Sequence, residues 1–253
     1  MTDRSEIAKR LKDIPTTLAA DILKDEALFE RSVSGLAPMT AGSGRFAGTV
    51  RTIAFLPGRP ELRGRAGPPL NFSAIDALEP GEVLVLAAGG SMRGAILGDM
   101  LATRAHERGA AGAVVDGAVR DLAGMEEARL PVFARGVAPM AAHATLVPVA
   151  VNTQVRFGDV AVLPDDWVLA DEDGVLVLPL SLVERLIERH AAASVKERFS
   201  RQLLLAGFAL AEVFPLPAAL EPFLKDFAKT ERVPTAETVR QAIGDRSPAR
   251  HPK

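Results

Sequence analysis

The chain has 253 residues, 48% of them hydrophobic, and a formal net charge of −2 in which acidic and basic side chains are interspersed. This length is enough to bury one sizeable core, and such a charge gives no electrostatic footprint for nucleic acid. The absence of cysteine excludes a disulfide framework, a thiolate zinc site and a cysteine nucleophile.

The N-terminal segment MTDRSEIAKRLKDIP is charged and lacks the apolar core of a secretory signal. No apolar run in the sequence approaches the roughly 20 residues that a membrane-spanning helix needs. We therefore expect a cytoplasmic protein with neither a membrane nor a nucleic acid as partner.

In chain order, the apolar pattern first predicts one or two short helices over residues 4–30, with Thr16 or Thr17 as a helix cap. An alternating strand is predicted over 46–56. The Gly-, Pro- and Arg-rich segment 57–69 is predicted to be a loop. Such a loop is either a plain connector, a substrate lid or an oligomer contact.

From residue 71 the pattern becomes that of a βα unit. Continuous apolar runs predict strands at 82–87, 112–116 and 131–134, with helices over 93–108 and 121–128 between them. The Gly89-Gly90-Ser91 segment is predicted to be a turn after the first strand. It matches neither a dinucleotide fingerprint nor a P-loop, so it is only weak evidence for anion binding.

After Gly136, short strands at 147–151, 159–163, 166–171 and 174–179 predict antiparallel pairing beside a central parallel sheet. A long helix is predicted over 181–205, followed by an apolar segment interrupted by prolines. We expect an α/β fold with a central mixed sheet, one domain at 1–205 and a C-terminal helical extension at 206–253. The last residues of that extension are expected to fray.

Two carboxylates and a guanidinium fall at neighbouring turns of this α/β layer. Gly98-Asp99 lies at the head of one predicted helix, and Arg120-Asp121 follows the predicted strand at 112–116. Ligands of open α/β sheets bind beyond the carboxyl ends of the strands, which favours a site here. Mg²⁺ takes oxygen ligands and keeps several waters, so one direct carboxylate is enough, while the planar guanidinium suits a substrate carboxylate. Taken singly, each residue fits a helix N-cap or a surface ion pair better, so the prediction depends on the combination.

Other polar residues give weaker signals. Asp116 stands in an Asp-Gly pair and is predicted to be structural, a turn residue whose carboxylate bonds nearby backbone amides. The four histidines show no metal-ligand spacing, and no G-x-S-x-G motif of an α/β-hydrolase is present.

Three stretches carry a resemblance to a known family: G-x3-GD at 94–99, RG-AAG-x-VVDG-x-VRD at 108–121 and PVFARG at 131–136. PGEVLVL at 80–86 and ADEDGVLVLP at 170–179 support it. Through them the chain resembles the RraA-like family, which joins the regulator of ribonuclease activity A to class II aldolases such as 4-hydroxy-4-methyl-2-oxoglutarate aldolase. The resemblance implies an α/β/β swivelling-domain fold and a homotrimer that often pairs into a homohexamer, with sites at subunit contacts.

The resemblance also assigns roles to six positions. By this resemblance Asp121 would bind the metal, and Asp99 would contact the metal through water. Arg120 would contact the pyruvate moiety. The backbone of Met100 and Leu101 would contact the substrate carboxylate, and Gly98 would leave room for the substrate's approach. The implied metal is Mg²⁺ or Mn²⁺. Where the family usually carries an Asn and a His, this chain has Asn71 and no His. Glu197 and Glu212 remain alternatives for the acidic group that a neighbouring subunit often lends.

These features predict a divalent-metal-dependent lyase that cleaves a small 4-hydroxy-2-oxo acid to pyruvate through a metal-stabilised enolate. The same enolate would also serve as the intermediate of oxaloacetate decarboxylation. The alternative is a non-catalytic protein that binds and regulates a ribonuclease, and a related sugar-acid or oxo-acid activity also stays open. Lysines are not grouped in an apolar pattern, which disfavours a Schiff-base aldolase.

Overall fold

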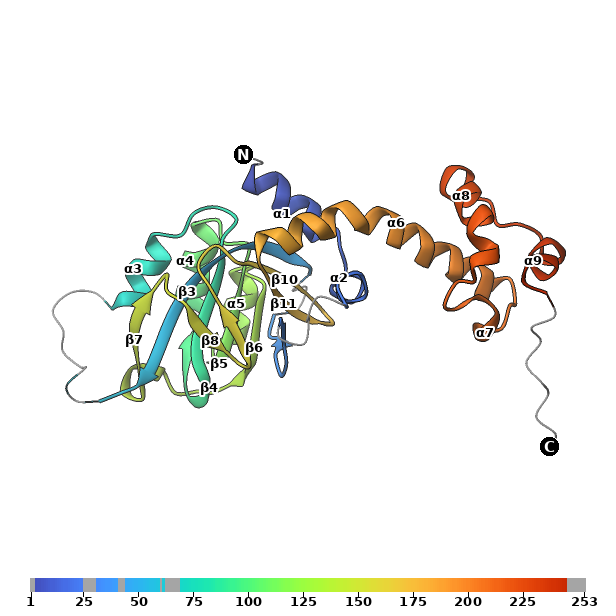
Figure 1. Ribbon diagram of the computed structural model, residues 1–253. Helices are drawn as coiled ribbons and strands as arrows, with labels where there is room; N and C mark the ends of the chain where they lie inside the picture. The colour runs from blue at the N-terminus through green and yellow to red at the C-terminus, as the bar shows by residue number, and fades with distance from the viewer. Residues whose placement is uncertain (1–2, 25–30, 41–43, 60, 62–68, 245–253) are drawn as a thin grey trace, which may run out of the picture. The chain divides into compact units, whose positions relative to one another are not determined.

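The computed structural model describes residues 3–24, 31–40, 44–59, 61 and 69–244 (Figure 1). The chain divides into two compact units, Met1–Ile187 and Glu188–Lys253. This division falls inside helix α6 (Leu180–Leu205), whereas the sequence placed a boundary after that helix, at 205/206. All six predicted site residues belong to the first unit.

A mixed sheet forms the centre of the first unit. Its parallel core consists of four neighbouring strands, β3 (Phe46–Pro57), β4 (Val83–Leu97), β5 (Gly112–Val119) and β6 (Val132–Val137). Antiparallel strands extend this core on both sides, and they are β1 (Ser32–Val33), β2 (Ala37–Pro38), β7 (Leu146–Val151), β10 (Trp167–Asp171) and β11 (Gly174–Leu178). The predicted central mixed sheet is therefore confirmed.

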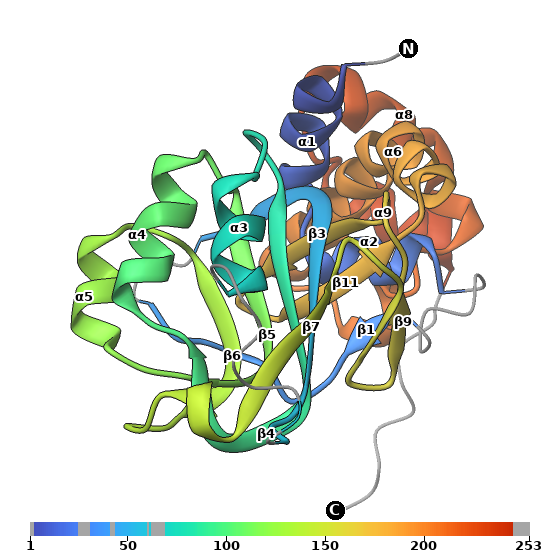
Figure 2. The same cartoon turned by 90° about the vertical axis from the view of Figure 1, so that its left-hand side faces the viewer.

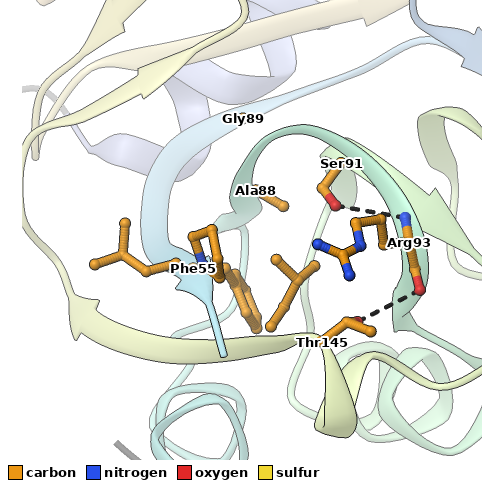
Figure 3. Close-up of a pocket in the computed structure, with 9 residues that line it drawn as sticks. Phe55, Ala88, Gly89, Ser91, Arg93 and Thr145 are labelled. Carbon is orange, nitrogen blue, oxygen red and sulfur yellow. Dashed lines mark hydrogen bonds between the residues drawn. The ribbon is translucent and has the colours of Figure 1, made fainter. Parts of the chain in front are cut away.

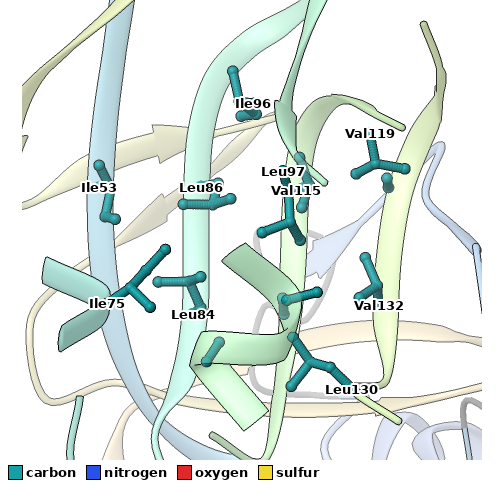
Figure 4. Close-up of a cluster of buried hydrophobic side chains, with 14 of the residues drawn as sticks. Ile53, Ile75, Leu84, Leu86, Ile96, Leu97, Val115, Val119, Leu130 and Val132 are labelled. Carbon is teal, nitrogen blue, oxygen red and sulfur yellow. The ribbon is translucent and has the colours of Figure 1, made fainter. Parts of the chain in front are cut away.

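Helices cover one face of the parallel strands (Figure 2), namely α3 (Leu70–Asp76), α4 (Asp99–Glu107) and α5 (Leu122–Glu127). Side chains between these helices and the sheet form the largest buried cluster, in which Ile75 of α3 meets Ile53, Leu84 and Leu86 of the strands (Figure 4). The β8 (Val155–Phe157) and β9 (Val160–Val162) hairpin contributes to a second cluster with β10 and β11. The sheet is thereby fixed on both faces, and its carboxyl edge can hold side chains in place.

Short helices at the N-terminus cover the antiparallel part of the sheet. α1 (Arg4–Lys12) and α2 (Thr16–Ile22) share an apolar cluster with β10, β11 and the first turns of α6. The second unit is helical, with α7 (Leu210–Val213), α8 (Glu221–Thr230) and α9 (Ala236–Ile243) around a small core. The mixed α/β class with a C-terminal helical extension is thus confirmed. No helix in the described ranges is long and apolar enough to cross a membrane.

Strand β4 is much longer than the sequence indicated. It continues through the predicted Gly89-Gly90-Ser91 turn to Leu97, and α4 begins only at Asp99, so the helix start predicted near Arg93 is wrong. The reason is non-local pairing: Ala87 is opposite Asp116 and Ser91 opposite Gly117, so β4 bulges while staying in the sheet. We refer to residues 88–95 of β4 as the bulged segment.

Asp116, predicted as a turn residue, and Thr16, predicted as a helix cap, instead belong to hydrogen-bond networks around buried carboxylates. Asp116 lies within β5 and forms an ion pair with Arg135, so the predicted turn is wrong, although its predicted structural role agrees with this pairing. Pro15 occupies the N-cap position of α2, and Thr16 donates its backbone N–H (2.8 Å) and its hydroxyl to the buried Asp171. Both carboxylates come from distant parts of the chain, which local sequence patterns do not reveal.

Asp166 provides a test of stability against pH. Burial raises the pKa of its carboxyl group, although the Leu163 N–H (2.8 Å) partly offsets the shift. Because the pKa is higher in the folded state, the charged carboxylate lowers the free energy of unfolding when the pH is above the folded-state pKa. This loss of stability disappears when the pH is below the unfolded-state pKa of about 3.9. We expect Asp166→Asn to be more stable than wild type at pH 7, with the difference vanishing as the pH falls towards about 3.9. Urea unfolding at both pH values measures it, with Asp159→Asn, at an almost fully exposed position, as the control.

Candidate active site

The predicted site residues meet where β4 and β5 end. β4 ends at Leu97 and β5 at Val119, and the N–H of Arg120 donates to the carbonyl of Leu97 (3.0 Å). This bond places the Gly98-Asp99 segment directly beside the Arg120-Asp121 segment. Both segments lie at the carboxyl edge of the parallel strands, where α/β proteins bind ligands.

Arg120 and Asp121 form an ion pair at this edge. The Nε of Arg120 lies 3.1 Å from the Oδ2 of Asp121, and the two side chains are 41% and 44% exposed. Asp121 adopts the left-handed backbone conformation (φ 59°), which is uncommon for a residue other than glycine. It stands at the N-cap of α5, yet its side chain makes no capping hydrogen bond. The simple N-cap interpretation therefore does not explain this carboxylate.

Gly98 leaves space for these two side chains. A Cβ atom at this position would lie 3.0 Å from the Oδ2 of Asp121 and 3.3 Å from the Cγ of Arg120. Gly98 has φ −142°, an extended conformation that any residue adopts, so the constraint on it is steric. The structure thus brings Gly98, Arg120 and Asp121 into one cluster.

Asp99 is the first residue of α4 and packs against α5. Its Oδ1 accepts a hydrogen bond from the N–H of Met100 (2.7 Å). A Cβ on Gly124 would lie 2.7 Å from the Cβ of Asp99, so only glycine allows this approach of the two helices. Gly124 is not among the residues predicted for the site, and its only signal in the sequence is that a glycine is the third residue of a short helix. Met100 is exposed, while Leu101 packs against the core.

The remaining candidates lie elsewhere. Asn71 is in the first turn of α3 and is partly buried. Glu197 pairs with Arg201 (2.7 Å), and Glu212 accepts the N–H of Ala209 (2.6 Å), so each glutamate has a partner within the second unit.

The donor set at this site suits a hard cation. Among the described residues no group of three or more His, Cys, Asp or Glu side chains is placed to hold a metal ion. Mg²⁺ and Mn²⁺ accept one or two carboxylates and complete their shell with water and substrate oxygens. The Asp121 carboxylate at the end of β5 is a donor of this type, and Asp99 lies on the adjacent segment after β4.

Comparison with known proteins identifies relatives of this chain. A family model described as "RraA-like: Aldolase/RraA" matches residues 16–177. A protein of Alkalilimnicola ehrlichii with the provisional name 4-hydroxy-4-methyl-2-oxoglutarate aldolase is 36% identical, over 68% of this chain and 98% of its own length. The 4-hydroxy-4-methyl-2-oxoglutarate aldolase of Thermus thermophilus is 37% identical, over 54% of this chain and 78% of its own length.

Solved structures give a second type of relative. The crystal structure of Streptomyces coelicolor RraAS2, described as an unusual member of the RNase ES inhibitor RraA family, has a TM-score of 0.72 and 30% identity. The similarity covers 79% of this chain and 98% of that one. An RNA-processing inhibitor RraA from Thermus thermophilus has a TM-score of 0.53 and 34% identity over 66% of this chain and 93% of its own.

Proposed function

The chain belongs to the Aldolase/RraA family, and from that premise we propose that it is a divalent-metal-dependent lyase that releases pyruvate from a 4-hydroxy-2-oxo acid. The observation that carries the proposal is the cluster of Gly98, Arg120 and Asp121 at the ends of β4 and β5. It combines a cation-binding carboxylate and a carboxylate-binding guanidinium on adjacent residues. The aldolase names of the relatives point to the same chemistry.

The side chains divide the task between them. Arg120 pairs with the substrate carboxylate and orients the oxo acid, since its planar fork matches a carboxylate. Asp121 would hold Mg²⁺ or Mn²⁺, and Asp99 would contribute to the same site through water. When bound, such a cation supplies Lewis-acid stabilisation of the charge that develops on the oxo oxygen. Gly98 leaves the space in which the substrate reaches these groups.

The reaction breaks the bond between C3 and C4 of the substrate. A base removes the proton of the C4 hydroxyl, the C4 oxygen becomes a carbonyl, and the bonding electrons pass to C3 as an enolate. Water near Asp99 then returns a proton to C3 and yields pyruvate. Decarboxylation of oxaloacetate forms the same enolate but needs no hydroxyl base. It therefore does not depend on the His that this chain lacks in the stretch before β4.

Removal of the metal is the direct test. We expect pyruvate release from 4-hydroxy-4-methyl-2-oxoglutarate or oxaloacetate with Mg²⁺, and loss of that release with EDTA. Restoration by excess Mg²⁺ or Mn²⁺ is the control for irreversible damage. Pyruvate production that is unaffected by EDTA, or no production from either acid by folded and metal-loaded protein, contradicts the proposal.

Gly98 gives a milder test of the same site. A methyl group at this position would approach Asp121 and Arg120 to within 3.0–3.4 Å, which forces these side chains to shift by a few tenths of an ångström. We expect Gly98→Ala to lower kcat/KM about tenfold, a transition-state loss of about 1.4 kcal/mol, with little change in melting temperature. Gly136→Ala is the matched control, because a Cβ there would meet only the Cε of Met92 (3.0 Å), and it should leave kcat/KM unchanged. Unchanged kcat/KM in Gly98→Ala would place the substrate elsewhere.

Regulation of a ribonuclease is the second candidate. One structural relative is described as an RNA-processing inhibitor, and another as an unusual member of the RNase ES inhibitor RraA family. An inhibitor surface has no need for the Gly98, Arg120 and Asp121 cluster, which favours the lyase. Inhibition of a purified RNase E-type enzyme by the Asp121→Asn variant as well as by wild type would support regulation independently of the lyase test.

A further inference from the structure

A small pocket lies at the carboxyl end of β3, beside the bulged segment of β4 (Figure 3). Its volume is about 280 Å³. Its described lining residues are Phe55, Leu56, Pro57, Ala88, Gly89, Ser91, Arg93, Thr145 and Leu146. None of them is among the six residues of the proposed active site, so the pocket is a separate feature of the first unit.

The walls of the pocket are held by backbone pairing. Leu146 pairs with Pro57 across the β3–β7 ladder, and the N–H of Gly58 donates to the carbonyl of Thr145 (2.7 Å). On the other side, the N–H of Ala95 donates to the carbonyl of Met140 (2.8 Å), which anchors the bulged segment. The pocket is therefore preformed, and a ligand would not have to order its walls.

Arg93 is the only charged residue among those described in the lining. Its backbone is held on both sides: its N–H donates to the Oγ of Ser91 (3.4 Å), and its carbonyl accepts from the Oγ1 of Thr145 (3.4 Å). Its guanidinium group makes no hydrogen bond or ion pair with any residue in the described ranges. In Figure 3 the guanidinium points across the pocket towards Phe55. Among the described lining residues the pocket therefore presents one cation and no acidic side chain.

The rest of the lining combines apolar surface with one more donor. Phe55, Ala88 and Leu146 are buried, with exposed fractions of 8%, 7% and 4%, and form an apolar wall. The hydroxyl of Ser91 accepts the N–H of Arg93, so its own proton remains available to an oxygen acceptor. A guanidinium and a hydroxyl next to hydrocarbon surface match a carboxylate attached to a short alkyl chain.

From this arrangement we propose that the pocket binds a small aliphatic carboxylate, with its carboxylate on Arg93 and Ser91 and its alkyl chain against Phe55, Ala88 and Leu146. The volume of about 280 Å³ lies just below the roughly 300–1,000 Å³ of pockets that hold drug-sized ligands, so the ligand has few carbons. This is a site additional to the proposed lyase site, and it does not depend on the lyase proposal being correct.

Ligand-observed NMR titration of the full-length protein with isovalerate, in EDTA, tests the proposal. Isovaleramide has the same shape without the charge, and we expect it to bind at least about tenfold more weakly. Arg93→Gln removes the exposed guanidinium and should weaken isovalerate binding about tenfold or more, because a hydrogen bond to a charged group is lost. Ser91→Ala should weaken it by about threefold, which provides a second variant with a smaller change.

Two control variants separate this pocket from other cationic surfaces. Arg120→Gln alters the proposed active site and Arg10→Gln an exposed position on α1, and both should retain wild-type affinity for isovalerate. Equal affinity for isovalerate and isovaleramide, or an unchanged affinity in Arg93→Gln, would overturn the proposal. Loss of binding in Arg120→Gln but not in Arg93→Gln would assign isovalerate to the active site, which overturns the pocket and leaves the lyase proposal intact.

Discussion

Asp121→Asn should abolish metal-dependent pyruvate release, with kcat/KM lowered by at least about 10³-fold. The expected loss corresponds to about 4 kcal/mol of transition-state stabilisation, the scale of a metal ion acting on developing charge. Asparagine keeps the size of the side chain and tolerates the left-handed backbone at this position (φ 59°), so only the negative charge is removed. The fold should survive because the carboxylate caps no helix. Steady-state kinetics across a range of Mg²⁺ concentrations measure both the turnover and the apparent metal affinity.

Asp159→Asn is the matched control for this prediction. Asp159 is also paired with an arginine, Arg156 at 3.0 Å, but its side chain is almost fully exposed and far along the chain from the proposed site. Asp159→Asn should therefore leave kcat/KM within about twofold of wild type. Asp99→Asn should fall between the two, with a loss of about 10–100-fold, because an acid acting through water contributes less than a direct ligand. Turnover at the wild-type level in Asp121→Asn would refute the assignment of the metal.

The part of the fold that depends on local pattern could be predicted from the sequence. The alternating segment at 46–56 became β3, and the apolar run at 82–87 became the first half of β4. The cluster of Gly98, Arg120 and Asp121 could also be anticipated, because residues that follow neighbouring parallel strands meet at one edge of the sheet. For this cluster, the order of the strands along the chain is enough to predict which residues lie close together.

Features built from distant segments could not be predicted in this way. The bulged segment of β4 contains Gly89 and Gly90, which locally favour a turn, but pairing of Ser91 with Gly117 keeps it in the sheet. The pocket beside it is lined by residues of β3, of β4 and of the chain around the start of β7. No single stretch of sequence therefore predicts the pocket. Arg93 was predicted to start a helix, and its place in the pocket follows only from the assembly of those segments.

Asp116 and Arg135 form another such pair, and breaking it should have the largest effect on stability. Asp116 is 1% exposed, and its Oδ1 accepts the Nε of Arg135 while its Oδ2 accepts the N–H of Gly158 (3.0 Å). Arg135 also donates to the carbonyl of Ser34 (3.3 Å). The pair thus ties β5 and β6 to the β8–β9 hairpin and to the chain near β1. Removal of one partner leaves the other charge uncompensated in a largely buried position.

Asp116→Ala should accordingly lower the free energy of unfolding by about 3 kcal/mol or more, as expected for one partner of a buried ion pair. The exposed pair of Asp76 and Arg104 has comparable geometry (2.6 Å), yet Asp76→Ala should cost less than about 1 kcal/mol, because solvent screens its charges. The double variant Asp116→Ala/Arg135→Met should be more stable than Asp116→Ala alone, since no unpaired charge remains buried. Denaturant unfolding of the four proteins decides the matter: equal losses at Asp116 and Asp76 would mean that burial adds nothing to the inner pair. A double variant no more stable than Asp116→Ala would instead assign the loss to the hydrogen bond with Gly158, and the hairpin would then depend on the carboxylate itself rather than on charge neutralisation.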